Sequence, residues 1–228
     1  MRRSNLATKA RKEGELQDLE NSESVEWFLR SEYDRLTEML LYTKEMGQKR
    51  VQFWLTVISA IGGLLAVIYQ INGADAGFLT FTMVALLGIL LLGLVIFLKL
   101  VQRTITSVEY LRAQGKIKRY FVDKMPKIEK YFYFPVTDDQ PKLVHSFAFK
   151  LTGSSMRLLV VVINSFLIAA VVAILPRMVY GNWEFVGYQI VMGIAVFVMS
   201  FALHEAFTCK LFQQAEKAIA DKVAFPSK

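Results

Sequence analysis

The sequence predicts an all-α integral membrane protein with four transmembrane helices, arranged as two hairpins with cytoplasmic helical extensions. Of its 228 residues, 54% are hydrophobic, and they concentrate in four blocks separated by charged segments. Each block has the roughly 20 residues that a helix needs to cross a hydrocarbon core of about 30 Å. Lipid offers the backbone no hydrogen-bond partners, so continuous apolar segments of this length are expected to be helical.

The segment before the first block is charged. Residues 1–23 mix basic and acidic side chains without the apolar core of a signal peptide, so we expect a disordered cytoplasmic tail. Residues 24–50 predict a cytoplasmic helix that continues into the first span, with Ser22 or Ser24 as its N-cap. Residues spaced by four and three form a heptad-like stripe, which can pack within one subunit or as a coiled coil between subunits. The stripe consists of Leu29, Tyr33, Leu36, Leu40, Thr43 and Gly47.

The first two spans are predicted at 51–71 and 78–98. Only Asn72–Gly77 joins them, which predicts a tight helical hairpin. The second helix is expected to continue as a cytoplasmic helix over residues 99–125. It should end at Met125-Pro126, because proline disfavours the helical conformation in the residue before it.

Residues 126–157 predict a cytoplasmic loop, rich in proline and aromatic residues, that leads through an interfacial segment into the third span. The loop contains four consecutive aromatic side chains. They can form a surface for a ligand or partner, pack on the preceding helices, or lie at the level of the lipid headgroups. These residues are Tyr131, Phe132, Tyr133 and Phe134.

The last two spans are predicted at 158–175 and 185–203. Pro176 follows the third span directly. Residues 204–228 are expected to form a cytoplasmic C-terminal helix whose apolar side chains share one face. That face consists of Leu211, Phe212, Ala215, Ile219 and Val223.

The distribution of basic residues predicts the orientation of the spans. Of the 27 lysine and arginine residues, 26 lie in the N-terminal region, the middle segment or the C-terminal tail, and Arg177 lies on the opposite side. Because lysine and arginine near membrane spans mark the cytoplasmic side, both termini are expected in the cytoplasm. We therefore predict a multi-pass membrane protein with both termini in the cytoplasm. The net charge of +7 is read mainly as this orientation signal rather than as nucleic-acid binding.

No sequence motif points to catalysis, a cofactor or a metal, so we expect a protein that is not an enzyme. His145 and His204 lie far apart, neither begins a metal-ligand pattern, and Cys209 is the only cysteine. His204 and Glu205 can form a pH-sensitive gate at the inner end of the fourth span, or simply lie at the interface.

Small residues on the predicted spans indicate close helix packing, within a subunit or between copies of the chain. They include Ala169, Ala170 and Ala173 in the third span. Asn164 can hydrogen-bond a neighbouring helix or line a pore. The residues predicted to mediate helix packing or oligomerisation are Ser59, Gly62, Gly63, Ala66, Gly88, Gly93 and Asn164.

Over Ser24–Asp123, the order of cytoplasmic helix, span pair and cytoplasmic helix resembles small membrane effectors of bacterial antiviral systems, such as the SLATT group. The second span pair departs from the two-span pattern of that group. The resemblance implies a protein that perturbs the inner membrane when a cytoplasmic partner activates it, and it transfers no functional residue.

The sequence thus predicts a non-enzymatic membrane protein that oligomerises and forms a pore or perturbs the membrane under cytoplasmic control. Its expected partners are the lipid bilayer, further copies of the chain and a cytoplasmic protein. Two alternatives remain open: a membrane anchor or scaffold that recruits a cytoplasmic partner, and a small channel or transporter.

Overall fold

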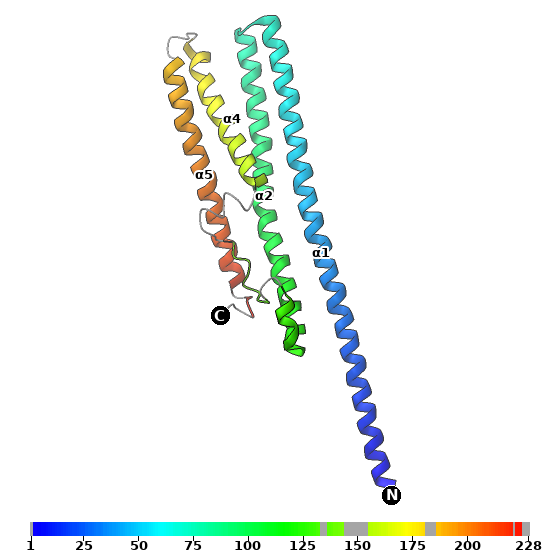
Figure 1. Ribbon diagram of the computed structural model, residues 1–228. Coiled ribbons are helices and arrows are strands. Elements are labelled where there is room, and N and C mark those ends of the chain that lie inside the picture. Colours follow the sequence, from blue (N-terminus) through cyan, green and yellow to red (C-terminus); the bar gives the residue numbers. More distant parts are fainter. Residues whose placement is uncertain (1, 133–135, 144–154, 181–185, 221, 225–228) are drawn as a thin grey trace. The chain divides into compact units, whose positions relative to one another are not determined.

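A computed structural model describes the backbone of residues 2–132, 136–143, 155–180, 186–220 and 222–224, and the side chains of most of these from residue 23 onward. Its elements are α1 (Arg2–Asn72), α2 (Ala76–Lys124), the short 3₁₀ helix η1 (Pro126–Tyr131), α4 (Ser155–Tyr180) and α5 (Val186–Ala220) (Figure 1). Within these residues the chain is helical without strands, and α1, α2, α4 and α5 are each long and apolar enough to cross a membrane. The predicted all-α class with four candidate spans is confirmed at this level.

Helix α1 begins well before the predicted start. It runs from Arg2 and passes through Ser22 and Ser24 without a break, where the sequence analysis expected a disordered tail and then an N-cap. The physical reason lies in composition, because alanine, leucine, lysine, arginine and glutamate, all strong helix formers, dominate residues 2–20.

The connection between α1 and α2 is shorter than the six residues predicted. Gly73 has a φ of +68° and donates its N–H to Tyr69 O at 2.8 Å, so it ends α1 in the left-handed conformation that glycine adopts most easily. Asp75 Oδ1 then accepts the N–H of Phe78 at 2.7 Å, which caps the first turn of α2. At its other end α2 stops at Lys124, immediately before Met125-Pro126 as expected.

Helices α4 and α5 both extend beyond their predicted ends. Helix α4 continues through Pro176 to Tyr180, because a proline near the end of a helix removes only one backbone hydrogen bond. Helix α5 runs through His204 to Ala220, so the predicted C-terminal helix is the continuation of the fourth span. Phe185 and the predicted interfacial segment, residues 147–151, lie outside the described residues.

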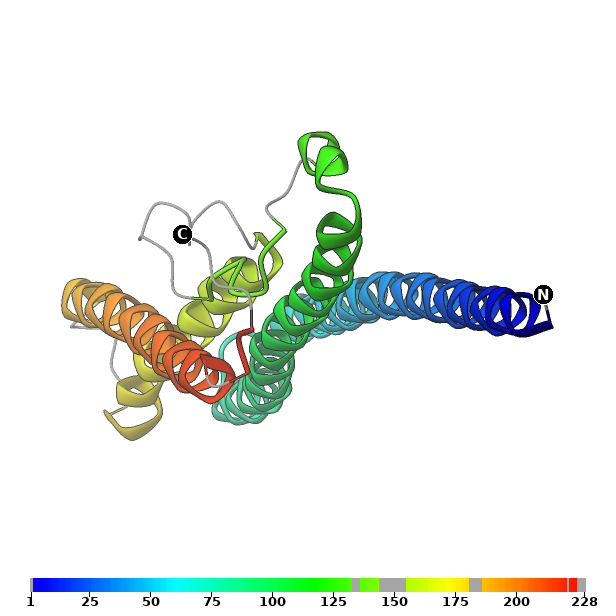
Figure 2. The same ribbon diagram turned by 90° about the horizontal axis from the view of Figure 1, so that it is seen from below.

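The chain divides into two compact units. The first unit comprises Met1–Tyr42, Tyr110–Gln140 and Ala224–Lys228, and the second comprises Thr43–Glu109 and Pro141–Val223. Helices α1 and α2 contribute residues to both units, whereas α4 and α5 belong to the second. Helices α4 and α5 pack against each other (Figure 2).

In the first unit, the predicted stripe on α1 is the packed face. Leu36 and Leu40 are buried, and Leu29 and Tyr33 are half-buried. The side-chain amide of Gln114 on α2 donates a hydrogen bond to Thr37 Oγ1 at 2.8 Å. These contacts lie within one chain.

In the second unit, the core forms where α1, α2 and α4 meet. Trp54 of α1 is fully buried and donates its indole N–H to the backbone carbonyl of Ile89 on α2 at 3.3 Å. A Cβ at Gly93 would lie 2.7 Å from Trp54 Cζ2 and would overlap Oδ1 of Asn164 on α4. The predicted apolar face of the last helix joins this core through Leu211, Phe212, Ala215 and Ile219.

The two predicted packing glycines of α2 therefore have different surroundings, and this makes a matched pair of variants. We expect Gly93→Ala to lower the thermal unfolding midpoint of the protein in detergent, because overpacking typically costs about 1–3 kcal/mol. Gly88→Ala should cause no loss, since a Cβ at Gly88 would have no atom within 4 Å. Equal midpoints for both variants would show that α1 and α4 do not approach α2 as closely as described.

Candidate functional site

The small residues predicted to mediate packing fall into two groups. Gly93 and Asn164 are buried inside the second unit. Ser59, Gly62, Gly63 and Ala66 on α1 are all exposed, and so is Gly88 on α2. A Cβ built at Gly62 or Gly63 has no neighbouring atom within 4 Å. The first span thus presents a small-residue face that packing within the chain leaves uncovered.

Polar side chains are buried in the apolar core without hydrogen-bond partners in the described part of the chain. Asn164 and Ser165 on α4 are both fully buried, and neither the amide atoms of Asn164 nor Ser165 Oγ has a partner there. Thr82 Oγ1 on α2 is likewise buried without a hydrogen-bond partner in the described part of the chain. The contact of Asn164 with Gly93 is steric, so the predicted hydrogen bond to a neighbouring helix is not found among these residues. Polar groups without partners inside an apolar core are costly, typically by about 1–3 kcal/mol each.

A buried ion pair joins α4 to α5. Nη1 of Arg157, whose side chain is only 4% exposed, lies 2.6 Å from Oε1 of Glu205. The same nitrogen lies 3.4 Å from the hydroxyl of Thr208, one turn further along α5. The sequence analysis counted Arg157 as a flanking basic residue. No local signal identified its partner, because the two residues are 48 positions apart.

His204 lies beside this pair but faces another helix. Its Nδ1 lies 2.8 Å from the backbone carbonyl of Ser200, and its ring meets the ring of Phe97 on α2 edge-on, with centroids 4.9 Å apart. The imidazole is buried. His204 therefore packs between α5 and α2, while Glu205 is held by Arg157.

Arg177, the one basic residue predicted on the opposite side, also has a structural contact. Its guanidinium donates a hydrogen bond to the backbone carbonyl of Ala74 at 3.2 Å. Ala74 lies in the connection between α1 and α2, so the C-terminal end of α4 and this connection lie at the same end of the second unit.

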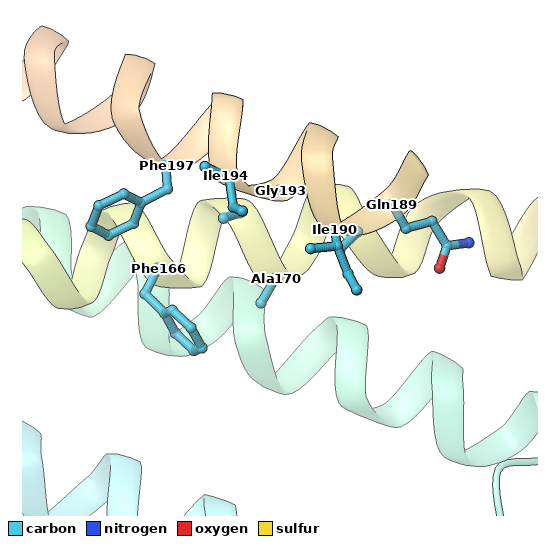
Figure 3. A pocket seen from close by; sticks show the side chains of 9 residues that line it. Phe166, Ala170, Gln189, Ile190, Gly193, Ile194 and Phe197 are labelled. Carbon is cyan, nitrogen blue, oxygen red and sulfur yellow. The ribbon is translucent and has the colours of Figure 1, made fainter. Parts of the chain in front are cut away.

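An apolar pocket of about 470 Å³ lies between α4 and α5 (Figure 3). Three alanines predicted as small residues of the third span, Ala169, Ala170 and Ala173, form part of its wall together with Gly193 of α5. Figure 3 shows the rings of Phe166 and Phe197 at one end of the pocket and Gln189 at the other. Apart from Gln189 the lining residues are apolar, so the pocket is suited to contact with hydrocarbon chains.

The first unit contains a second pocket, of about 610 Å³, with a different character. Phe132, from the predicted aromatic surface, lines it, whereas Tyr131 is 78% exposed and does not. Tyr133 and Phe134 lie outside the described residues. The pocket is lined by Glu26, Trp27, Arg30, Tyr33, Ile117, Lys118, Phe121 and Phe132.

Comparison with known proteins adds no assignment. No family model matches the chain, and neither the curated proteins nor the solved structures include a significant match. Among the described residues, no group of three or more histidine, cysteine, aspartate or glutamate side chains is placed to hold a metal ion.

The ion pair between Arg157 and Glu205 yields a prediction about stability. Arg157→Met should destabilise the protein strongly, because it leaves the Glu205 carboxylate, 18% exposed, without its cation. Removing one partner of a buried pair typically costs about 3–5 kcal/mol, whereas replacing both by apolar residues is often neutral.

The test compares thermal unfolding of Arg157→Met with the double variant Arg157→Met/Glu205→Leu in the same detergent. The double variant should recover most of the loss. The exposed Lys210 on α5 supplies the control Lys210→Met, which should unfold like the wild type. If the double variant is no more stable than Arg157→Met, the pair does not hold α4 and α5 as described.

Proposed function

We propose that this chain is a non-enzymatic membrane protein that crosses the bilayer four times and assembles with copies of itself to perturb the membrane or form a pore. The observation that carries the proposal is the uncovered small-residue face of α1. Faces of this kind allow two helices to approach closely in lipid. Four helices are long and apolar enough to cross a membrane, as the proposal requires.

The burial of the four candidate spans leaves two of them largely uncovered. In the most apolar 18-residue windows of α1 and α5 only 11% of residues are buried within the chain, against 33% for α2 and for α4. An uncovered apolar face can be covered by lipid or by another subunit. The four small residues on that face distinguish α1 from a helix that only contacts lipid.

The proposed orientation puts both termini in the cytoplasm. It rests on the 26 basic residues outside the connection that contains Arg177. Glu23–Asn72 of α1 alone comprises 50 residues. At a rise of 1.5 Å per residue this is about 75 Å of helix, and only about 30 Å of it is needed to cross the hydrocarbon core. The remainder, with the end of α2, forms the proposed cytoplasmic part that controls the membrane part.

Control of a membrane assembly by cytoplasmic helices is also what the resemblance to the SLATT group implies. In such an arrangement a cytoplasmic signal changes α1 and α2 outside the bilayer, and both helices continue into the spans without a break. The inner membrane of a bacterium is the proposed location.

One observation favours the alternative of a small channel or transporter. Asn164 and Ser165 are polar, fully buried and without partners in the described part of a predicted span. Polar groups within a span often mark a path for ions or solutes. Coupling of flux to an ion gradient in proteoliposomes would distinguish a transporter from a pore.

The topology can be tested by cysteine labelling in a Cys209→Ala background. Asn72→Cys should react with a membrane-impermeant maleimide in intact cells, because it lies at the exposed end of the first span. Lys127→Cys should react only after the cells are permeabilised. Asn72 is preferred to Asp75, whose side chain caps α2. Labelling of Lys127→Cys in intact cells would reverse the proposed orientation.

The assembly can be tested by filling the small-residue face. Gly62→Leu and Gly63→Leu should reduce the oligomer mass in nanodiscs and the conductance of reconstituted bilayers, because leucine prevents close approach of a second helix. The thermal stability of the protomer should not fall, since no atom of the chain lies within 4 Å of a Cβ built at either glycine.

The matched control is Val67→Leu, on the same helix and 52% exposed, which should keep both the mass and the conductance of the wild type. Unchanged mass and conductance in both glycine variants would mean that this face contacts lipid, and the proposed assembly would fail. Absence of conductance in wild-type protein of confirmed oligomeric mass would leave the scaffold alternative.

A further inference from the structure

We propose that the pocket in the first unit binds a small anion that carries an aromatic ring, with nucleotides as the ligand class. Residues of α1 and α2 form most of the pocket, and Phe132, which follows η1, completes it. Its volume of about 610 Å³ falls within the roughly 300–1,000 Å³ typical of small-molecule sites.

Aromatic side chains make up half of the lining. Trp27 and Tyr33 come from α1, Phe121 from α2, and Phe132 from the segment after η1. Trp27 is 72% exposed although it lies outside the predicted spans. Three separate segments thus direct rings at one space, and such rings are the surfaces on which planar bases stack.

The pocket also contains positive charge that the protein does not neutralise. Lys118 is half-buried, and its ammonium nitrogen lies 5.9 Å from the ring centroids of both Tyr33 and Phe132. In the described part of the chain, neither Lys118 nor Arg30 forms an ion pair or a hydrogen bond with a carboxylate. A half-buried cation held by rings alone retains its capacity to bind an anion.

The one acidic residue of the pocket is already paired. Glu26 Oε1 lies 3.0 Å from Nζ of Lys124. Hydrogen bonds with Tyr120 and then with Glu26 raise the pKa of Lys124 above its usual value, so the lysine remains charged and its attraction offsets the carboxylate. The lining therefore carries two positive charges, those of Arg30 and Lys118, and one negative charge, that of Glu26, which is paired with Lys124 outside the lining.

The combination of rings and cations selects the ligand class. A lipid headgroup or inorganic phosphate supplies the anion without a ring, and a nucleoside supplies the ring without the charge. A nucleotide supplies both, with the base against the aromatic side chains and the phosphates near Lys118 and Arg30. Binding of a nucleotide at this pocket does not depend on the proposed pore. A role of that nucleotide as the cytoplasmic signal that controls the pore rests on the proposed function.

The test uses the full-length protein in nanodiscs of phosphatidylcholine. The probes are ATP, GTP, CTP and UTP, compared with tripolyphosphate and with adenosine, and binding is followed by titration calorimetry and by tryptophan fluorescence. At least one nucleoside triphosphate should bind saturably and quench Trp27, with loss of the quench in Trp27→Phe. Tripolyphosphate and adenosine should each bind about tenfold more weakly or worse, because each lacks one of the two contacts.

Variants separate this pocket from general anion binding. Lys118→Met and Phe132→Leu should each weaken binding by about tenfold or more. Lys127→Met, at an exposed lysine outside the pocket, should bind like the wild type. Circular dichroism and elution volume establish that each variant is folded.

Three results would overturn the proposal: no binding of any of the four nucleotides, equal binding of tripolyphosphate, or binding unaffected by both pocket variants. Replacing part of the phosphatidylcholine by anionic phosphatidylglycerol tests the headgroup as occupant, and a quench of Trp27 by these lipids alone would also overturn it. Nucleotide binding without conductance would refute the proposed pore and leave the proposed nucleotide site standing. Conductance without nucleotide binding would refute the nucleotide site and leave the pore standing.

Discussion

The packing of the second unit depends on the close approach of three helices at Gly93. The space that a side chain would occupy there is filled by Asn164 of α4 and Trp54 of α1. In an α-helix the carbonyl of Ile89 accepts the N–H of Gly93, and the indole of Trp54 donates to that same carbonyl from outside the helix. One turn of α2 therefore positions both neighbouring helices. The close contact also encloses the Asn164 amide, which has no hydrogen-bond partner in the described residues.

The four long helices differ in how much of their apolar surface is buried within the chain. The apolar windows of α2 and α4 are three times as buried as those of α1 and α5. Helix α5 is joined to α4 by the ion pair between Glu205 and Arg157. On α1, Val51 and Trp54 are the fully buried residues of the core, and Leu55, Ile58 and Ile61 pack against it while partly exposed. Because few other residues of the α1 span are covered, most of its surface remains available to lipid or to another subunit.

Much of the fold could be predicted because the relevant signals are local. The four apolar blocks and the stop at Met125-Pro126 each depend on a short stretch of sequence, and the structure has four long apolar helices there and ends α2 at Lys124. The N-terminal segment is helical although its mixed charge is typical of a disordered tail, because its residues have high helix propensity. Helix α4 continues through Pro176, beyond the predicted end of the third span, because proline disfavours a helix without always ending it.

The candidate sites were less predictable, because they depend on residues brought together from distant positions. The exposure of Gly62 and the burial of Gly93 cannot be distinguished by residue type, since the difference lies in which neighbour faces each one. Phe132 was expected in a partner surface as part of an aromatic run. Its association with Trp27 and Lys118 emerged only from three-dimensional structure, because these residues belong to three separate segments.

The ion pair between Arg157 and Glu205 has a consequence for biosynthesis. The two residues are 48 positions apart, and a ribosome adds about 5–20 residues per second, so α4 exists for roughly 2–10 s before its counter-ion has been made. During that interval the guanidinium of Arg157 lacks the carboxylate that later neutralises it. In the proposed four-span topology, water or lipid phosphate therefore solvates this guanidinium until α5 has been made.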